Sequence, residues 1–223
     1  LDGIFQFNTD LFDASTIERM AASFVRLLEV VTDQPDRPIG ELDVLDLTER
    51  RRLIEDWNNT AEKVDPVLVH QLFEAQAVRV PDQVAVSCEG RALTYAELDA
   101  RANQLAHHLR AHGAGPDVLV GLLVDRSPDM MVGLLGILKS GAAYVPLDPH
   151  FPRDRLEYMM ADSGLRLLVS EADLVAGWTL PEHTTVTCLD RDAGQLATLP
   201  VSRPASSASP EQLVYVIYTS GST

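Results

Sequence analysis

An amphipathic helix is predicted where apolar residues first recur three and four positions apart. The apolar residues are Ile17, Met20, Phe24, Leu27, Leu28 and Val31. This spacing places them on one face of a helix. Ser15 and Glu18 precede most of the run in the pattern of a capping box, and the prolines that follow it forbid its continuation. A second short helix is predicted from Thr48 towards Trp57.

The pattern changes near residue 65. A helix is predicted over residues 66–80, with Leu68, Leu72 and Phe73 facing inward. Two short apolar runs, 84–88 and 91–93, flank Glu89-Gly90 and are typical of a hairpin with a tight turn. The next helix starts at the Thr94–Glu97 capping box, and its apolar stripe (Leu98, Ala102, Leu105, Leu109) ends before Gly113.

Strands and helices then alternate. Apolar strands are predicted over residues 118–124, 143–147, 166–169, 185–189 and 213–218. Between the first four lie two helices, one opened by Ser127-Pro128 and ended by Gly141, the other spanning Pro152 to Asp162. Such alternation indicates a parallel sheet covered by helices on both faces, so the predicted fold class is α/β.

Composition narrows the possible partners. The 223 residues carry 33 acidic and 18 basic side chains, a formal charge of −15. This charge repels nucleic acid and anionic membrane surfaces, so neither is an expected partner. The longest apolar run, residues 130–138, is too short to span a bilayer. The two cysteines, Cys88 and Cys188, fit no metal or redox spacing and are expected to be reduced thiols of a cytoplasmic protein.

The last predicted strand opens into a loop of hydroxyls and glycine. The loop residues are Thr219, Ser220, Gly221, Ser222 and Thr223. Amides freed by glycine and rotatable hydroxyls can cradle phosphate oxygens, and open α/β sheets bind ligands at the carboxyl ends of their strands. Many turns of the same composition bind nothing. The patterns of P-loop nucleotide hydrolases and of the α/β-hydrolase nucleophile are both absent.

Other candidate groups are better explained by local structure. His108 and His112 have the i, i+4 spacing of a metal pair, but no acidic ligand accompanies them and a solvated helix end explains them more simply. Asp148 precedes a proline and is interpreted as a turn residue. Asp125 and Arg126 are interpreted first as a turn pair and second as ligand contacts. No catalytic residue and no metal ligand is assigned.

Three stretches together resemble a known family. They are Leu93-Thr94-Tyr95-Ala96-Glu97-Leu98, Leu138-Lys139-Ser140-Gly141-Ala142-Ala143-Tyr144-Val145-Pro146-Leu147-Asp148, and Leu213 to Thr223. In order and approximate spacing they resemble the first three core motifs of adenylation domains, the adenylate-forming enzymes of nonribosomal peptide synthetases. The first two motifs are interpreted as structural, and the third as the opening of the phosphate loop.

The leader resembles the end of a condensation domain. Residues 7–13, the helix after them, and 49–60 resemble the tail of that domain and the linker that follows it. The resemblance therefore implies a mainly helical condensation-domain end at 1–47, a linker at 48–65, and the N-terminal portion of an adenylation domain at 66–223. Because the first residue is Leu1 and the family loop continues through a glycine and a lysine, a segment of a longer polypeptide is expected.

The resemblance also implies a chemistry. Such domains use ATP and Mg²⁺ to convert an amino acid to an aminoacyl adenylate, then load it onto the phosphopantetheine thiol of a carrier domain in the same polypeptide. Thr219, Ser220, Gly221, Ser222 and Thr223 would hold the ATP phosphates. The chain by itself is expected to be inactive. Two alternatives stay open: a non-catalytic scaffold or docking platform between domains, and a fragment of an acyl-CoA ligase-type relative, which the condensation-like leader disfavours.

Overall fold

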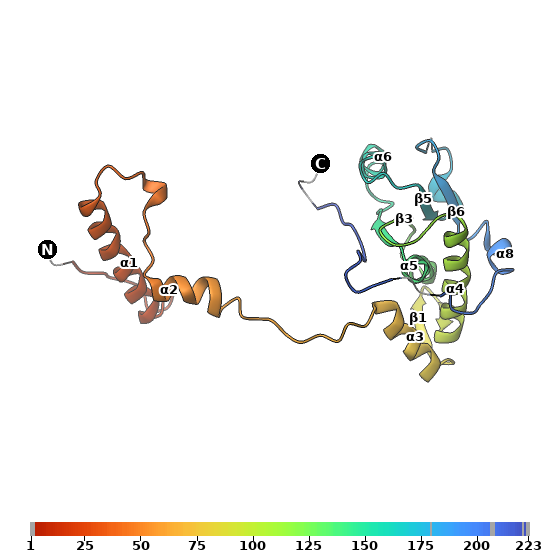
Figure 1. Cartoon of the computed structure of the whole chain (residues 1–223), viewed down its shortest axis with the longest axis horizontal. Helices are drawn as coiled ribbons and strands as arrows, with labels where there is room; N and C mark the ends of the chain where they lie inside the picture. The colour runs from red at the N-terminus through yellow and green to blue at the C-terminus, as the bar shows by residue number, and fades with distance from the viewer. Residues whose placement is uncertain (1–2, 179, 206–207, 220, 222–223) are drawn as a thin grey trace. The chain divides into compact units, whose positions relative to one another are not determined.

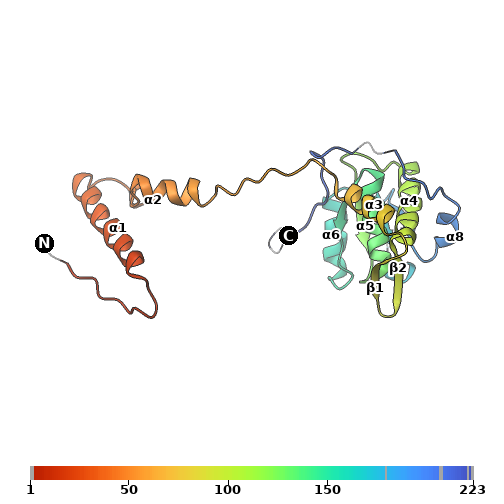
Figure 2. The ribbon, with the colours of Figure 1, turned by 90° about the horizontal axis from the view of Figure 1, so that it is seen from below.

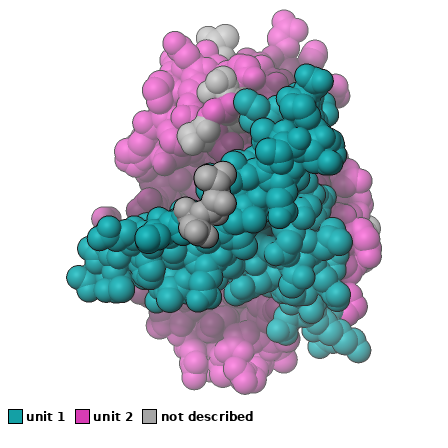
Figure 3. Space-filling view, turned by 90° about the vertical axis from the view of Figure 1, so that its left-hand side faces the viewer, with its two compact units in different colours: residues 1–65 teal, residues 66–223 magenta. Residues whose placement is uncertain are grey.

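A computed structural model describes residues 3–178, 180–205, 208–219 and 221 of the chain. It divides into two compact units, Leu1–Asp65 and Pro66–Thr223 (Figures 1 and 3). In the described part of the chain, no helix has both the length and the apolar character needed to cross a membrane.

The first unit is helical, as predicted. It contains α1 (Ala14–Asp33), a 3₁₀ turn η1 (Ile39–Glu41), α2 (Leu47–Arg51) and a π-helical turn η2 (Arg52–Asp56) that continues α2. In α2 the side chain of Asp46 caps the helix, accepting a hydrogen bond from the amide of Glu49 at 2.8 Å.

The predicted capping box of α1 is wrong. The helix begins at Ala14, with Asp13 at the N-cap and no side-chain capping hydrogen bond, so Ser15 lies inside the first turn. The predicted apolar face does form, but only Ile17 is buried, while Met20 and Phe24 are about half exposed. This unit is too small to cover a second apolar layer, so most of the stripe keeps contact with solvent.

The second unit opens with α3 (Val69–Arg79), which begins three residues later than predicted. The inward orientation predicted for Leu72 is wrong, since its residue exposure is 60%. The buried face instead carries His70, Glu74 and Ala77. Two of these side chains are polar, so the helix packs partly through charge, which a hydrophobic pattern does not reveal.

The hairpin and its following helix match the prediction. Strand β1 (Val84–Cys88) pairs antiparallel with β2 (Arg91–Thr94) around Glu89 and Gly90, both with positive φ. Helix α4 (Tyr95–Ala111) follows, and its capping box is confirmed. The Glu97 carboxylate accepts from the Thr94 amide at 2.8 Å, and the Thr94 hydroxyl accepts from the Glu97 amide at 3.2 Å.

The predicted parallel sheet is also confirmed. It contains β3 (Leu119–Leu123), β4 (Ala143–Pro146), β5 (Leu167–Ser170) and β6 (Thr185–Cys188) in the spatial order β4-β3-β5-β6. The connections contain α5 (Pro128–Ser140), α6 (Arg153–Asp162) and the short α7 (Ala172–Val175); α8 (Ala193–Leu196) follows β6. All neighbouring strands in this sheet run parallel.

Helices cover both faces of this sheet (Figures 1 and 2). One apolar cluster joins α4 and α5 to Val120 and Leu122 of β3, and a second joins α6 to Leu123 of the same strand. Alternate residues of β3 therefore enter opposite cores, as strand geometry requires. Gly141, with φ of 91°, ends α5 and turns the chain into β4.

The predicted strand 213–218 does not form as a continuous strand. The described residues make a single parallel bridge between Tyr144 and Tyr215. The Tyr144 amide donates to the Val214 carbonyl at 3.1 Å, and the Val216 amide donates to the Tyr144 carbonyl at 3.0 Å. The segment is thus held beside β4 through one residue of that strand.

Candidate functional site

A cavity of about 650 Å³ lies at the carboxyl ends of β3 and β4. Parallel strands bring their carboxyl ends to one edge of the sheet, where open α/β folds bind ligands. Its walls are mainly apolar, with polar groups from three chain segments. The lining residues are Leu122, Val124, Asp125, Arg126, Met130, Pro146, Leu147, Asp148, Pro149, His150, Phe151, Met159, Ile217 and Tyr218.

The polar rim comes from the loops that leave the strands. Asp148 accepts hydrogen bonds from the amide and from Nδ1 of His150, at 2.9 and 3.0 Å. These bonds hold the pKa of the Asp148 carboxyl below its ordinary value. The turn interpretation of Asp148 is confirmed, but the same residue also borders the cavity, as do Asp125 and Arg126.

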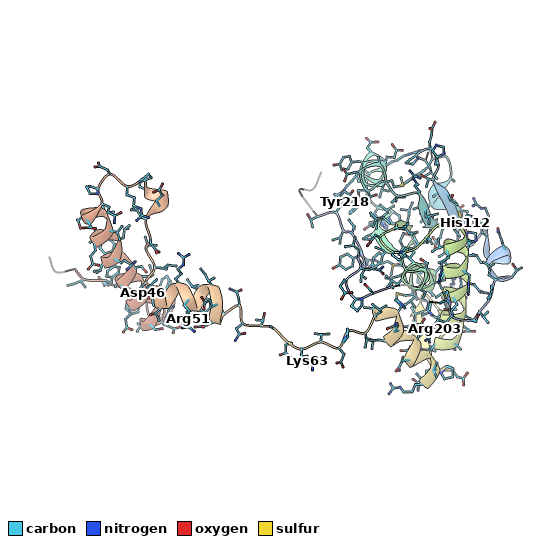
Figure 4. All side chains as sticks on the ribbon, viewed as in Figure 1. Asp46, Arg51, Lys63, His112, Arg203 and Tyr218 are labelled. Carbon is cyan, nitrogen blue, oxygen red and sulfur yellow. The ribbon has the colours of Figure 1, made fainter. Side chains whose placement is uncertain are left out.

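Tyr218 closes one side of the cavity and precedes the predicted phosphate loop. Its hydroxyl donates to Oδ2 of Asp162, at the end of α6, at a distance of 2.5 Å. Its ring meets Tyr158 edge to face, with centroids 6.4 Å apart. Figure 4 labels Tyr218 on the last stretch of the chain. Burial first, and then the bond to the Asp162 carboxylate, raise the pKa of Tyr218 to about 12.

We expect Asp162→Asn to lower the pKa of Tyr218 from about 12 towards 10, because the negative charge that favours the neutral phenol is lost. Since the folded-state pKa lies above the unfolded value, the neutral phenol contributes stability below about pH 10, and this contribution disappears as the pH rises through about 12. Tyrosine-labelled ¹³C NMR titration, assigned with Tyr218→Phe, measures the shift.

The control for this titration is Asp154→Asn, an exposed carboxylate at the other end of the same helix. It should leave the pKa of Tyr218 unchanged. If Asp162→Asn leaves it unchanged as well, burial alone sets the value and the hydrogen bond does not contribute.

The structure describes Thr219 and Gly221 of the predicted phosphate loop; Ser220, Ser222 and Thr223 lie outside the described residues. Thr219 is exposed and directly follows the cavity-lining pair Ile217 and Tyr218. Gly221 has φ of 109°, and a Cβ placed there would meet no atom within 4 Å. The glycine is therefore required by backbone conformation and not by crowding, and amides near such residues can turn together towards an anion.

The histidine pair sits at the end of α4. The rings of His108 and His112 are tilted by 37° with centroids 4.3 Å apart, and His112 Nδ1 bonds to the His108 carbonyl at 2.8 Å. Burial, and then the neighbouring His112, lower the pKa of His108. Among the residues that the structure describes, no three histidine, cysteine or acidic side chains converge to hold a metal ion.

One charged cluster was not predicted from the sequence. The side chain of Lys139 is fully buried, and its Nζ lies 2.9 Å from Glu74 Oε1, 2.7 Å from Asp99 Oδ1 and 2.7 Å from Asn103 Oδ1. Glu74 also pairs with Arg203 at 3.0 Å. The signal in the sequence was a lysine that ends an otherwise apolar helix, where a charge rarely stays buried without partners.

Comparison with known proteins gives a consistent result over most of the chain. A family model described as AMP-binding enzyme matches residues 73–223. A linear gramicidin synthase of Brevibacillus parabrevis is 47% identical over 226 residues, and tyrocidine synthase 3 of the same organism is 43% identical over 218. These matches cover 100% and 97% of this chain but only 4% and 3% of the relatives.

A solved structure extends the likeness to the fold. The crystal structure of a variant of the nonribosomal peptide synthetase FmoA3, in its AMPPNP-bound form, superposes with a TM-score of 0.75 at 31% sequence identity. The alignment covers 94% of this chain and 22% of that protein.

Proposed function

The chain belongs to the AMP-binding enzyme family, and on this premise we propose that it contributes the N-terminal part of an adenylation domain to a nonribosomal peptide synthetase. The whole enzyme would join an amino-acid carboxylate to the α-phosphate of ATP, releasing pyrophosphate. The aminoacyl group would then pass to the phosphopantetheine thiol of a carrier domain. Because the chain spans only 4% of its gramicidin synthase relative, these steps are proposed for the larger protein.

The proposed domain division is 1–47 for the end of a condensation domain, 48–65 for a linker, and 66–223 for the adenylation portion. Two observations support its second boundary. The compact units divide between Asp65 and Pro66, and the family model begins at residue 73. The likeness to the synthetases extends over the entire chain, which supports a place for the helical leader in the same assembly.

The proposed ATP contact is the loop Thr219, Ser220, Gly221, Ser222 and Thr223. The observation that carries the proposal is the left-handed backbone at Gly221, three residues after the cavity-lining Tyr218. A loop of this conformation beside the carboxyl edge of a parallel sheet fits a phosphate group. The AMPPNP-bound form of the FmoA3 relative supports ATP as the nucleotide.

Within the loop, the hydroxyl of Thr219 and the backbone near Gly221 would bind and orient the phosphates. Orientation of this kind lowers the barrier by fixing the reacting groups and stabilising developing charge. Bound Mg²⁺ would neutralise part of the phosphate charge. The chain's own formal charge of −15 repels an anionic nucleotide, and such neutralisation would reduce this repulsion.

Amino-acid-dependent exchange of pyrophosphate into ATP tests this function in the full-length synthetase. We expect Gly221→Ala to raise the KM for ATP about tenfold, because a left-handed backbone costs a residue with a Cβ about 1–2 kcal/mol. The KM for the amino acid should change little, since Gly221 is proposed to contact phosphate alone.

Gly194→Ala is the matched control. Gly194 lies in α8, where a Cβ meets no atom within 4 Å and φ is not positive. Exchange that requires no amino acid, or no exchange with any amino acid, would contradict the proposed function. Equal ATP KM values for the two variants would refute the role of the loop.

A further inference from the structure

A chain of polar contacts links the buried Lys139 to the segment that leads towards the proposed loop. Lys139 Nζ donates to Asn103 Oδ1 at 2.7 Å, which fixes the orientation of the Asn103 amide. The opposite end of that amide, Nδ2, donates to the Val201 carbonyl at 2.8 Å and to Asp99 at 3.0 Å. Asn103, on α4, therefore joins Lys139 of α5 to a backbone carbonyl that lies 98 residues after Asn103 itself.

A second branch reaches the same segment. Glu74 of α3 lies between Lys139 at 2.9 Å and Arg203 at 3.0 Å, and its side chain is only 2% exposed. Figure 4 labels Arg203 beside this part of the second unit. Both branches start from Lys139. They reach the chain at Val201 and Arg203, two residues apart, and together they hold one short stretch.

Other side chains on α4 hold the neighbouring carbonyls. Gln104 Nε2 donates to the carbonyls of Ala197 and Leu199 at 3.1 and 3.2 Å, His107 Nε2 bonds to the Ser202 carbonyl at 2.9 Å, and Arg110 donates to Ala205. With Asn103, these residues follow one face of the helix. Side chains of α4 thus hold residues 197–205, which belong to no helix or strand. The start of this segment also bonds through its backbone amides to the carbonyls of α8.

The motif that contains Lys139, residues 138–148, also holds the chain at a later point, near residue 215. Five residues after Lys139, Tyr144 binds Val214 and Val216 through its backbone. The polypeptide is therefore held at Val201–Arg203 and again at Val214–Val216, and Thr219 follows three residues later. Because both attachments lie on one covalent chain, we expect a shift at Val201–Arg203 to disturb the hydrogen bonds at Val214–Val216.

We propose that Asn103 is a positioning residue for the loop at 219–223, acting by holding the 197–205 segment in register. The inference rests on the proposed ATP contact of that loop. Asn103 touches no proposed substrate atom; it fixes a backbone carbonyl, and Lys139 fixes Asn103. The second core motif, interpreted as structural from its sequence, thereby acquires a role in placing the third.

Asn103→Asp tests the proposal with minimal change of shape. The carboxylate keeps its pairing with Lys139, but the donor that faced the Val201 carbonyl and Asp99 becomes an acceptor, so both hydrogen bonds are lost and Asp99 faces a like charge. In the full-length synthetase we expect the KM for ATP to rise roughly fivefold, the effect of losing the hydrogen bond that holds the Val201 carbonyl, with kcat changed less. A general loss of folded protein would instead lower kcat and leave KM unchanged.

Hydrogen exchange on the 223-residue chain provides a readout independent of ATP. The Val216 amide, bonded to the Tyr144 carbonyl, should exchange about tenfold faster in Asn103→Asp, because its protection depends on local order. Arg203→Gln removes the second branch through a half-exposed side chain, and should produce the same changes at smaller size. Gln195→Glu, an exposed position on α8, is the control of equal charge change.

The outcomes separate the two proposals. Faster exchange at Val216 together with a raised ATP KM supports the positioning role. Faster hydrogen exchange at Val216 with an unchanged ATP KM overturns the positioning role. In that case the pyrophosphate exchange reaction of the synthetase is unaffected, and the proposed function stands. If the unaltered synthetase shows no amino-acid-dependent exchange, the proposed function fails instead, and unchanged Val216 exchange in both variants would show that Asn103 and Arg203 do not hold the segment.

Discussion

Replacing Lys139 with methionine is expected to lower the free energy of unfolding by about 3 kcal/mol. The change removes a fully buried ammonium group and leaves two carboxylates, Glu74 and Asp99, facing an apolar side chain. A buried charge that loses its partner keeps the full cost of its desolvation. Arg203 still pairs with Glu74, so the loss should fall at the low end of the range for broken buried pairs.

Urea denaturation of the chain, followed by circular dichroism, measures this loss. Lys63→Met is the control, because Lys63 is the chain's other lysine, is exposed, and gives the same change of charge (Figure 4). Adding Asp99→Asn to Lys139→Met should restore part of the stability, since Lys139 is the ion-pair partner of Asp99 and the second change removes the charge that the first leaves behind. Equal stability of the two lysine variants would mean that the buried cluster contributes nothing to folding.

The second large effect is expected at the contact between α4 and α5. A Cβ at Gly136 would lie 2.5, 2.8 and 2.9 Å from Cδ2, Cγ and Cβ of Leu105. The last of these atoms is fixed to the backbone, so Gly136→Ala forces the two helices apart. We expect a net loss of about 1–2 kcal/mol, the cost of overpacking less the gain of about 1 kcal/mol from replacing a helical glycine.

Gly133→Ala, one turn earlier on the same helix, should be neutral or stabilising by up to about 1 kcal/mol. Its Cβ would approach only Leu122 Cδ1 closely, at 2.5 Å. That methyl group is the end of a flexible side chain, and Leu122 borders the cavity of about 650 Å³, which gives it room to rotate. Thermal unfolding of both variants tests the contrast, and equal melting temperatures would contradict it.

Short-range signals predicted most of the second unit correctly. Thr94 and Glu97 marked the start of α4, Gly141 marked the end of α5, and continuous apolar runs marked the strands of the parallel sheet. Each signal acts through atoms close in sequence: a capping hydrogen bond spans three residues, and a left-handed glycine acts at one position. Such features are decided before distant parts of the chain meet.

The errors have the opposite character. Leu72 is predicted inside because it is apolar, yet α3 buries Glu74 instead, and only Lys139 on another helix makes that arrangement favourable. A strand at 213–218 would need backbone hydrogen bonds along β4, but the segment pairs with β4 at a single bridge, between Tyr144 and Tyr215. Neither partner can be found by periodicity, because periodicity records which face is apolar and not what covers it.

The sequence by itself therefore determined the α/β class, the element order and the composition of the loop at 219–223. It also carried the resemblance to adenylation domains, which the AMP-binding match supports at the level of the family. Tertiary structure alone decided which side chains surround Lys139, where residues 197–205 are held, and that Tyr218 bonds to Asp162. These contacts join residues about 40 to 100 positions apart, and their energies depend on burial, which exists only once the chain is packed.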